Sequence, residues 1–142
     1  MIGLWVGLGT LVVATIVGLR WRTRQGRIAG GAVPGSAGSK PGLPEPVLRQ
    51  VDGAAAVILL QLNTPVCAQC PQARAVLGEL AATTPGVRHA ELNLAEHPEL
   101  AGRLGVRSTP TTLVLSRTGD ELFRVRGVPR RADLLSALRP HL

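Results

Sequence analysis

Aromatic side chains are almost absent from this 142-residue sequence, which has two Trp, one Phe and no Tyr. A hydrophobic core must therefore be aliphatic, and a hydrophobic content of 45% is sufficient to build one. The scarcity of aromatic residues and the lack of any RNA- or DNA-binding motif argue against a nucleic-acid partner. The length leaves room for one domain and an additional tail or anchor.

Cysteine is equally scarce, since Cys67 and Cys70 are the only two in the chain. Two cysteines cannot form the several disulfides of a small secreted scaffold. They are also too few for a structural zinc site, which takes four ligands, and the three histidines are scattered without paired spacing. We therefore expect no metal and no cofactor beyond a redox-active Cys67–Cys70 disulfide.

Acidic residues are missing from residues 1–40, which hold five of the 16 Lys and Arg side chains. From Pro41 on, eleven basic residues accompany nine acidic ones, so the formal net charge of +7 comes mostly from the N-terminal region. A basic stretch beside an apolar segment indicates a membrane as partner rather than a nucleic acid.

The apolar segment Ile2–Leu19 contains no charged residue over 18 positions. At about 1.5 Å per residue a helix of this length extends about 27 Å, close to the hydrocarbon thickness of a bilayer. Trp5 and Trp21 lie near its ends, and four arginines follow within residues 20–27, whereas a signal peptide carries its charge before the apolar run. We predict a retained single-pass transmembrane anchor over residues 1–21, with the domain in the cytoplasm and an extracytoplasmic domain as the alternative.

Two further features belong to this N-terminal part. Gly3 and Gly7 form a small-xxx-small pair that would allow a weak anchor dimer. Residues 22–46 combine the basic flank with a stretch rich in Gly, Ala, Pro and Ser that cannot bury much apolar surface, so we predict a linker. The folded domain is expected over residues 47–142.

Hydrophobic patterns in the predicted domain alternate between strand and helix. The expected strands cover residues 55–62, 87–94, 111–116 and 121–126, and the expected helices cover residues 67–82, 98–104 and 130–138. A parallel first pair of strands followed by an antiparallel hairpin predicts an α/β domain with a four-stranded mixed sheet flanked by helices.

The two cysteines lie where the first predicted strand of this domain meets the first helix. A spacing of three residues on one helical turn suits a disulfide that opens and closes, and the helix N-terminus favours the thiolate of Cys67. A disulfide that closes so short a loop adds little stability, which favours redox chemistry over the alternative of an inert or structural pair. We therefore assign Cys67 as nucleophile and Cys70 as the shielded, resolving thiol.

The order of these elements, with Cys-x-x-Cys after the first buried strand, resembles the thioredoxin fold, and the resemblance covers about residues 50–142. Residues 105–113 (GVRSTPTTL) are similar to the loop of that family that carries a cis-proline, here Pro110. The resemblance implies that Pro110 faces the cysteines and that the Thr109 backbone pairs with an extended stretch of substrate protein. Val66 stands where thioredoxins have a Trp and completes the predicted substrate-binding set.

Two other departures concern proton transfer. Gln61 replaces the buried Asp that helps move the proton of the second thiol in thioredoxins, and Glu91 replaces its usual Lys partner. A carboxylate buried without a cation has a raised pKa, so Glu91 is a candidate base, with a solvated strand residue as the alternative. We expect Gln61 to satisfy a polar pocket or a water rather than to perform the chemistry.

These observations predict a membrane-anchored thiol–disulfide oxidoreductase that exchanges its dithiol with protein disulfides and with an unidentified redox partner. Exposure to the cytosol, which keeps thiols reduced, favours a reductase. The alternative is a non-catalytic client-binding or redox-sensing module on the same fold, which the missing Trp and Asp favour.

Overall fold

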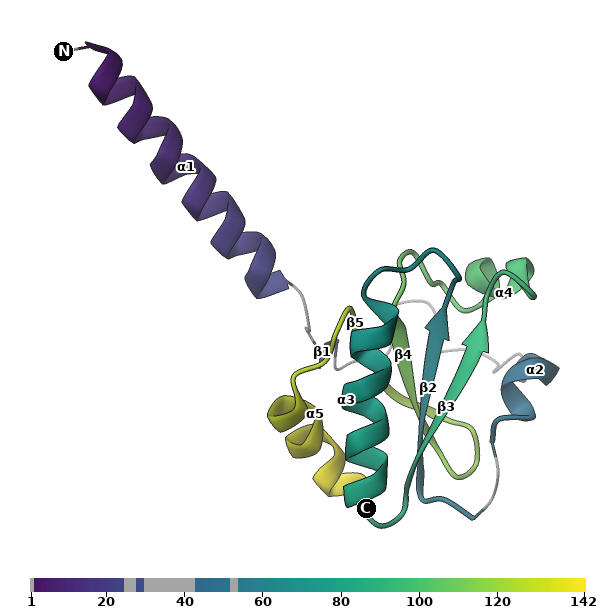
Figure 1. The fold of residues 1–142 in the computed structure, drawn as a ribbon. Coiled ribbons are helices and arrows are strands. Elements are labelled where there is room, and N and C mark those ends of the chain that lie inside the picture. Colours follow the sequence, from purple (N-terminus) through teal and green to yellow (C-terminus); the bar gives the residue numbers. More distant parts are fainter. Residues whose placement is uncertain (1, 25–27, 30–42, 52–53) are drawn as a thin grey trace.

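A computed structural model describes residues 2–24, 28–29, 43–51 and 54–142 of the chain (Figure 1). The elements are α1 (Ile2–Arg24), β1 (Ile28–Ala29), α2 (Glu45–Leu48), β2 (Val57–Asn63), α3 (Cys70–Thr83), β3 (Val87–Asn93), α4 (Pro98–Arg103), β4 (Thr111–Ser116), β5 (Glu121–Arg126), α5 (Arg131–Leu138) and a closing 3₁₀ turn (Arg139–His141). The predicted order of strands and helices is confirmed, and the last two strands have the predicted bounds.

The strands form one mixed sheet in the order β1-β5-β4-β2-β3. β2 and β3 are parallel, and the pairs β2–β4, β4–β5 and β1–β5 are antiparallel. The predicted four-stranded mixed sheet is therefore confirmed as β5-β4-β2-β3. The two-residue β1 extends it at the β5 edge, within a stretch that was predicted as linker.

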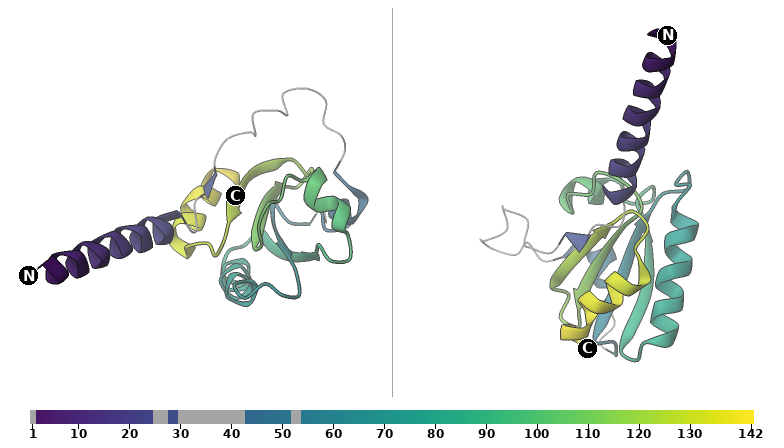
Figure 2. Two further views of the ribbon diagram at one scale, coloured as in Figure 1. Left: turned by 90° about the horizontal axis from the view of Figure 1, so that it is seen from above. Right: turned by 90° about the vertical axis from the view of Figure 1, so that its left-hand side faces the viewer.

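Helices cover both faces of this sheet, and the side chains of β2 alternate between them, since successive residues of a strand point to opposite faces (Figures 1 and 2). One aliphatic cluster lies on the side of α3 and α5 and includes Val57, Leu59, Leu77, Val114 and Leu134. The other lies on the side of α2 and α4 and includes Val47, Ile58, Leu60, Leu100 and Leu113. Phe123 is the single aromatic residue in either cluster, as the composition requires.

α1 extends away from the sheet in all three views of Figures 1 and 2. Large apolar side chains are exposed along its described part, namely Leu8, Leu11, Val12, Val13, Ile16, Val17 and Leu19. No helix in the described part of the chain has both the length and the apolar character that crossing a membrane requires. The structure does not describe the side chains of residues 2–7, which belong to the predicted span Ile2–Leu19, nor the side chain of Trp21. Most of the predicted linker also lies outside the described residues. The anchor therefore stays a prediction.

Candidate functional site

Cys67 and Cys70 are joined by a disulfide whose Cα atoms lie 5.5 Å apart. Cys70 is the first residue of α3 and is buried, with 4% of its surface exposed, whereas Cys67 is half-buried in the turn that precedes the helix. The pair therefore presents one partly accessible residue and one shielded residue, which suits the predicted division into nucleophile and resolving thiol.

The predicted helix start at Cys67 is wrong by three residues, and Pro71 gives the reason. A helix that began at Cys67 would need the N–H of residue 71 to bond to the Cys67 carbonyl, and proline has no N–H. That carbonyl accepts the N–H of Cys70 instead, at 3.3 Å, while the Cys67 N–H donates to the Thr64 carbonyl at 3.2 Å. Cys67 thus lies in a tight turn directly before the helix N-terminus.

The loop that carries Pro110 lies against the strand-to-helix loop that leads into Cys67. The Thr109–Pro110 peptide bond is cis, as the resemblance implied, and the hydroxyls of Thr109 and Thr64 are 3.3 Å apart. The Thr109 N–H and C=O make no backbone hydrogen bond to any residue that the structure describes. Val66, beside Cys67, is 93% exposed, so this side of the disulfide offers an apolar side chain and free backbone groups.

A polar row crosses the sheet beneath the first turn of α3. Gln61 on β2 is paired in register with Thr112 on β4 and with Glu91 on β3. Gln61 is fully buried, and its Nε2 donates to the carbonyl of Cys70 at 3.0 Å. Gln61 Oε1 and the Thr112 hydroxyl are both buried without a hydrogen-bond partner among the described residues. Cys70 therefore lies over two buried polar side chains, Gln61 and Thr112, with unused hydrogen-bonding capacity, and we call this pair the polar pocket.

Glu91, at the open end of this row, is held by Arg74 of α3 and by Asn63. Arg74 donates two hydrogen bonds to the carboxylate, at 2.6 and 2.7 Å, and Asn63 Nδ2 donates a third at 2.8 Å. The premise that Glu91 has no cation nearby is therefore wrong. The hydrogen bond to Glu91 raises the pKa of Arg74 above its ordinary value, so the guanidinium stays charged.

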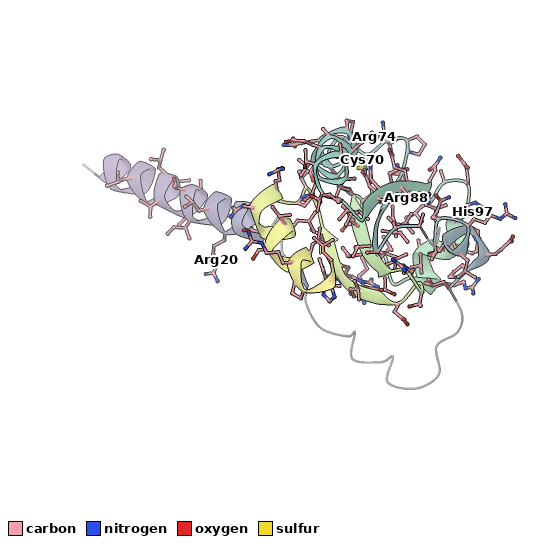
Figure 3. The ribbon with its side chains drawn as sticks, turned by 90° about the horizontal axis from the view of Figure 1, so that it is seen from below. Arg20, Cys70, Arg74, Arg88 and His97 are labelled. Carbon is pink, nitrogen blue, oxygen red and sulfur yellow. A yellow bond between two sulfur atoms is a disulfide. The ribbon has the colours of Figure 1, made fainter. Side chains whose placement is uncertain are left out.

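The sequence interpretation missed Arg74 and Thr112. Arg74 lies four residues after Cys70, on the same face of α3, as Figure 3 shows for the labelled pair. That spacing was readable from the sequence, whereas its contact with Glu91 depends on how α3 packs on β3. Thr112 could have been found from its position as the second residue of the predicted strand 111–116, once that strand was registered against Gln61.

An open cavity of about 770 Å³ adjoins the disulfide between α2 and the start of α3. Its lining contains both cysteines, His97 and charged residues of both signs, including Glu45, Arg49, Arg74, Glu91 and Glu96. Thr109 and Pro110 are not part of this lining. The disulfide is therefore bordered by a charged cavity on one side and by the cis-proline loop on another.

His89 lies near the polar row on the same face of β3. It is half-buried under α3, and its Nε2 is buried without a partner in the described part of the chain. Burial lowers the pKa of His89 below its ordinary value, because desolvation disfavours the charged imidazolium. In a search limited to the described residues, no group of three His, Cys, Asp or Glu side chains is placed to hold a metal ion.

Comparison with known proteins gives a family match over the domain that carries this site. The family model described as Thioredoxin matches residues 47–140. The thioredoxin of Chlamydia caviae is 31% identical over 88 residues, which is 62% of this chain and 85% of that protein. The thioredoxin of Methanocaldococcus jannaschii is 31% identical over 81 residues, covering 56% of this chain and 89% of that protein. The solved structure of a mutant thioredoxin from Halobacterium salinarum shares the fold, with a TM-score of 0.58 and 24% identity over 66% of this chain and 81% of that one.

Proposed function

Because the chain belongs to the thioredoxin family of thiol–disulfide oxidoreductases, we propose that it reduces disulfides of protein substrates with the Cys67–Cys70 dithiol. The observation that carries this proposal is the arrangement of the disulfide itself. Its half-buried residue lies beside the cis-proline loop, and its buried residue opens α3 over a polar pocket.

The exchange uses the two thiols in sequence. The Cys67 thiolate attacks one sulfur of the substrate disulfide, forms a mixed disulfide and releases the other substrate sulfur as a thiolate. The Cys70 thiol loses its proton, and its thiolate attacks Cys67 Sγ, which closes the Cys67–Cys70 disulfide and releases the second substrate thiolate. Two electrons pass to the substrate, and its two thiolates take up two protons. The turn before α3 places Cys67 at the positive end of the helix dipole, which favours its thiolate.

The proton of Cys70 has two candidate paths. Gln61 cannot titrate, so in this proposal it holds the Cys70 carbonyl. With Thr112 it offers polar contacts to a water that enters during turnover and takes the Cys70 proton. Both oxygens of Glu91 already accept hydrogen bonds, and a proton added there would weaken the ion pair with Arg74. The pocket is therefore the favoured path.

Substrate binding is assigned to Thr109, Pro110 and Val66. The free backbone groups of Thr109 suit pairing with an extended stretch of substrate, by the addition of a strand-like segment. The exposed Val66 offers that segment an apolar contact beside the attacking sulfur.

We also propose that the domain acts at a membrane, on its cytoplasmic side and as a reductase. The support is the uncharged run Ile2–Leu19, the basic residues 20–27 after it, and the exposed apolar side chains of α1. Carbonate extraction of membranes and protease treatment of intact cells test this part. Release of the chain by carbonate would refute the anchor, and digestion from outside would refute the cytoplasmic placement.

Insulin reduction by the full-length chain with dithiothreitol as electron donor tests the proposed activity. Cys67→Ser should reduce the rate to the background of dithiothreitol alone. Cys70→Ser, reduced beforehand and mixed with insulin after removal of dithiothreitol, should accumulate a mixed disulfide through Cys67. Wild-type protein no faster than Cys67→Ser would refute the enzyme, and trapping through Cys70 would reverse the assignment of roles.

The second candidate function is a client-binding or redox-sensing module. Gln61 in place of a titratable residue favours it, since the resolving step then lacks a buried carboxylate to accept the Cys70 proton. In that case the chain would bind an oxidised client, or cycle its own disulfide, without reducing insulin.

A further inference from the structure

Three arginines border the substrate side of the disulfide. Arg107 precedes the cis-proline loop, Arg126 ends β5, and Arg130 lies at the start of α5, and all three side chains are exposed. None of them belongs to the residues assigned above to catalysis or to substrate binding.

The backbone brings these positions together around Pro110. Arg126 is paired in register with Thr111, the residue that follows Pro110. Gly127, the next residue after Arg126, donates its N–H to the Pro110 carbonyl at 2.8 Å. Arg107 is three residues before Pro110, and Arg130 is three residues after Gly127. The loops that would receive a substrate segment therefore carry three positive charges.

These charges are not neutralised within the described chain. Arg49, Arg74, Arg124 and Arg131 each form an ion pair with a glutamate, whereas no described residue forms an ion pair or a hydrogen bond with the side chain of Arg107, Arg126 or Arg130. Asp133, three residues after Arg130, is exposed in the first turn of α5, and Glu121, five residues before Arg126, is already paired with Arg124. On the other side of the disulfide, Arg74 is neutralised by Glu91.

From this arrangement we infer that the partner is a protein whose reactive disulfide is flanked by acidic residues. The inference rests on the proposed function, because it names the substrate class of the same site. A cluster of unpaired like charges beside a binding loop raises the local concentration of oppositely charged partners and their association rate. The cluster also repels basic segments, so it discriminates between acidic and basic substrates. Because the three guanidiniums are exposed, the selection must weaken with salt.

Single-turnover reduction of three peptides tests this inference without an external reductant. The peptides share one disulfide and differ in flanking residues, which are Asp, Asn or Lys. Reduced full-length protein is mixed with each peptide, and each rate constant is divided by that for dithiothreitol alone, which corrects for the intrinsic reactivity of the disulfide. We expect the Asp peptide to exceed the Lys peptide by about tenfold at low ionic strength, and the ratio to approach one in about 1 M NaCl.

A charge-reversal variant and a matched control locate the effect. The triple variant Arg107→Glu, Arg126→Glu, Arg130→Glu should invert the preference. Arg117→Glu should keep it, since Arg117 is also exposed and unpaired among the described residues but lies at the opposite end of β4, in the turn before β5. Circular dichroism checks that both variants are folded. The salt series is measured on the wild-type protein, so it tests the inference even if a variant fails to fold.

The outcomes separate the two proposals. Reduction of the Asn peptide with an Asp-to-Lys ratio near one, or equal ratios in the triple variant and Arg117→Glu, would overturn the inference and leave the proposed function standing. Failure to reduce any of the three peptides would overturn the proposed function and, with it, the inference.

Discussion

The two ends of one sheet face differ sharply in chemistry. Away from the disulfide, the side chains that β2 and β4 turn toward α3 are apolar, with Val57, Leu59 and Val114 completely buried. Two residues further along β2, beneath Cys70, the same face carries Gln61 and Thr112. The strands, the helix that covers them and the depth of burial are shared, so the side chains alone make the difference.

Along the β2–β4 pair, the apolar end therefore serves stability and the polar end serves function. The apolar end stabilises the fold, because its aliphatic side chains are removed from water and packed against one another. The polar end leaves two buried oxygen atoms without a described partner, which costs stability and supplies hydrogen-bonding capacity at the resolving cysteine. Substitutions at the two ends should therefore have opposite signatures, one in unfolding and the other in redox kinetics.

Truncation at the apolar end should give the largest change in stability. Leu59→Ala removes a fully buried side chain and should lower the free energy of unfolding by about 3 kcal/mol. Single-turnover kinetics on the folded variant should match the wild type, because Leu59 belongs to the apolar cluster and not to the polar row. Urea unfolding measures the first quantity. A loss below about 1 kcal/mol, or slower reduction by folded protein, would show that the two ends are not separable.

Two adjacent threonines of β4 sharpen the comparison at the polar end. Both are buried, but the Thr111 hydroxyl donates to the Ser108 carbonyl at 2.7 Å, whereas the Thr112 hydroxyl has no described partner. Thr112→Val should therefore raise the free energy of unfolding by about 1 kcal/mol, and Thr111→Val should lower it by a similar amount.

Kinetics then decide whether the pocket serves the resolving step. If the pocket serves Cys70, Thr112→Val slows the decay of the mixed disulfide, and Thr111→Val leaves it unchanged. If the mixed disulfide of Thr112→Val decays at the wild-type rate, the pocket has no role in the resolving step. A loss of stability in Thr112→Val would show that its hydroxyl is satisfied in solution.

Much of this contrast was readable from the sequence. The apolar run that became β2 and the strands 111–116 and 121–126 were predicted because their patterns are strong and local. The start of α3 was predicted three residues too early, because the missing N–H of Pro71 outweighs the helical pattern that begins at Cys67. The partner of Glu91 was also missed, since Arg74 reaches it only through the packing of α3 on β3. β1 consists of two residues paired with a distant strand, and no local pattern marks such a pair.

A smaller effect is expected from His89, at the margin between the two ends. Its pKa is lowered by burial from the ordinary value of 6.5, so below that pH the unfolded chain binds more protons than the folded one. Stability should therefore fall as the pH drops through 6.5 toward the folded pKa. His89→Gln should flatten this slope in urea unfolding measured across that range. An unchanged slope in His89→Gln would contradict the prediction.

The smallest effect is expected at Glu91, where the polar row meets solvent. If the buried pocket serves the Cys70 proton, Glu91→Gln should change the decay rate of the mixed disulfide by less than about twofold, since loss of a general base costs about 10²–10⁴-fold. The control is Glu96→Gln, a second carboxylate of the same cavity, which accepts a hydrogen bond from Asn93 at 2.9 Å. A loss of about a hundredfold in Glu91→Gln alone, with a changed pH profile, would make Glu91 the proton acceptor. The chemistry of the polar end would then lie at its charged surface instead of in its buried pocket, and the Arg74–Glu91 ion pair would weaken at each turnover.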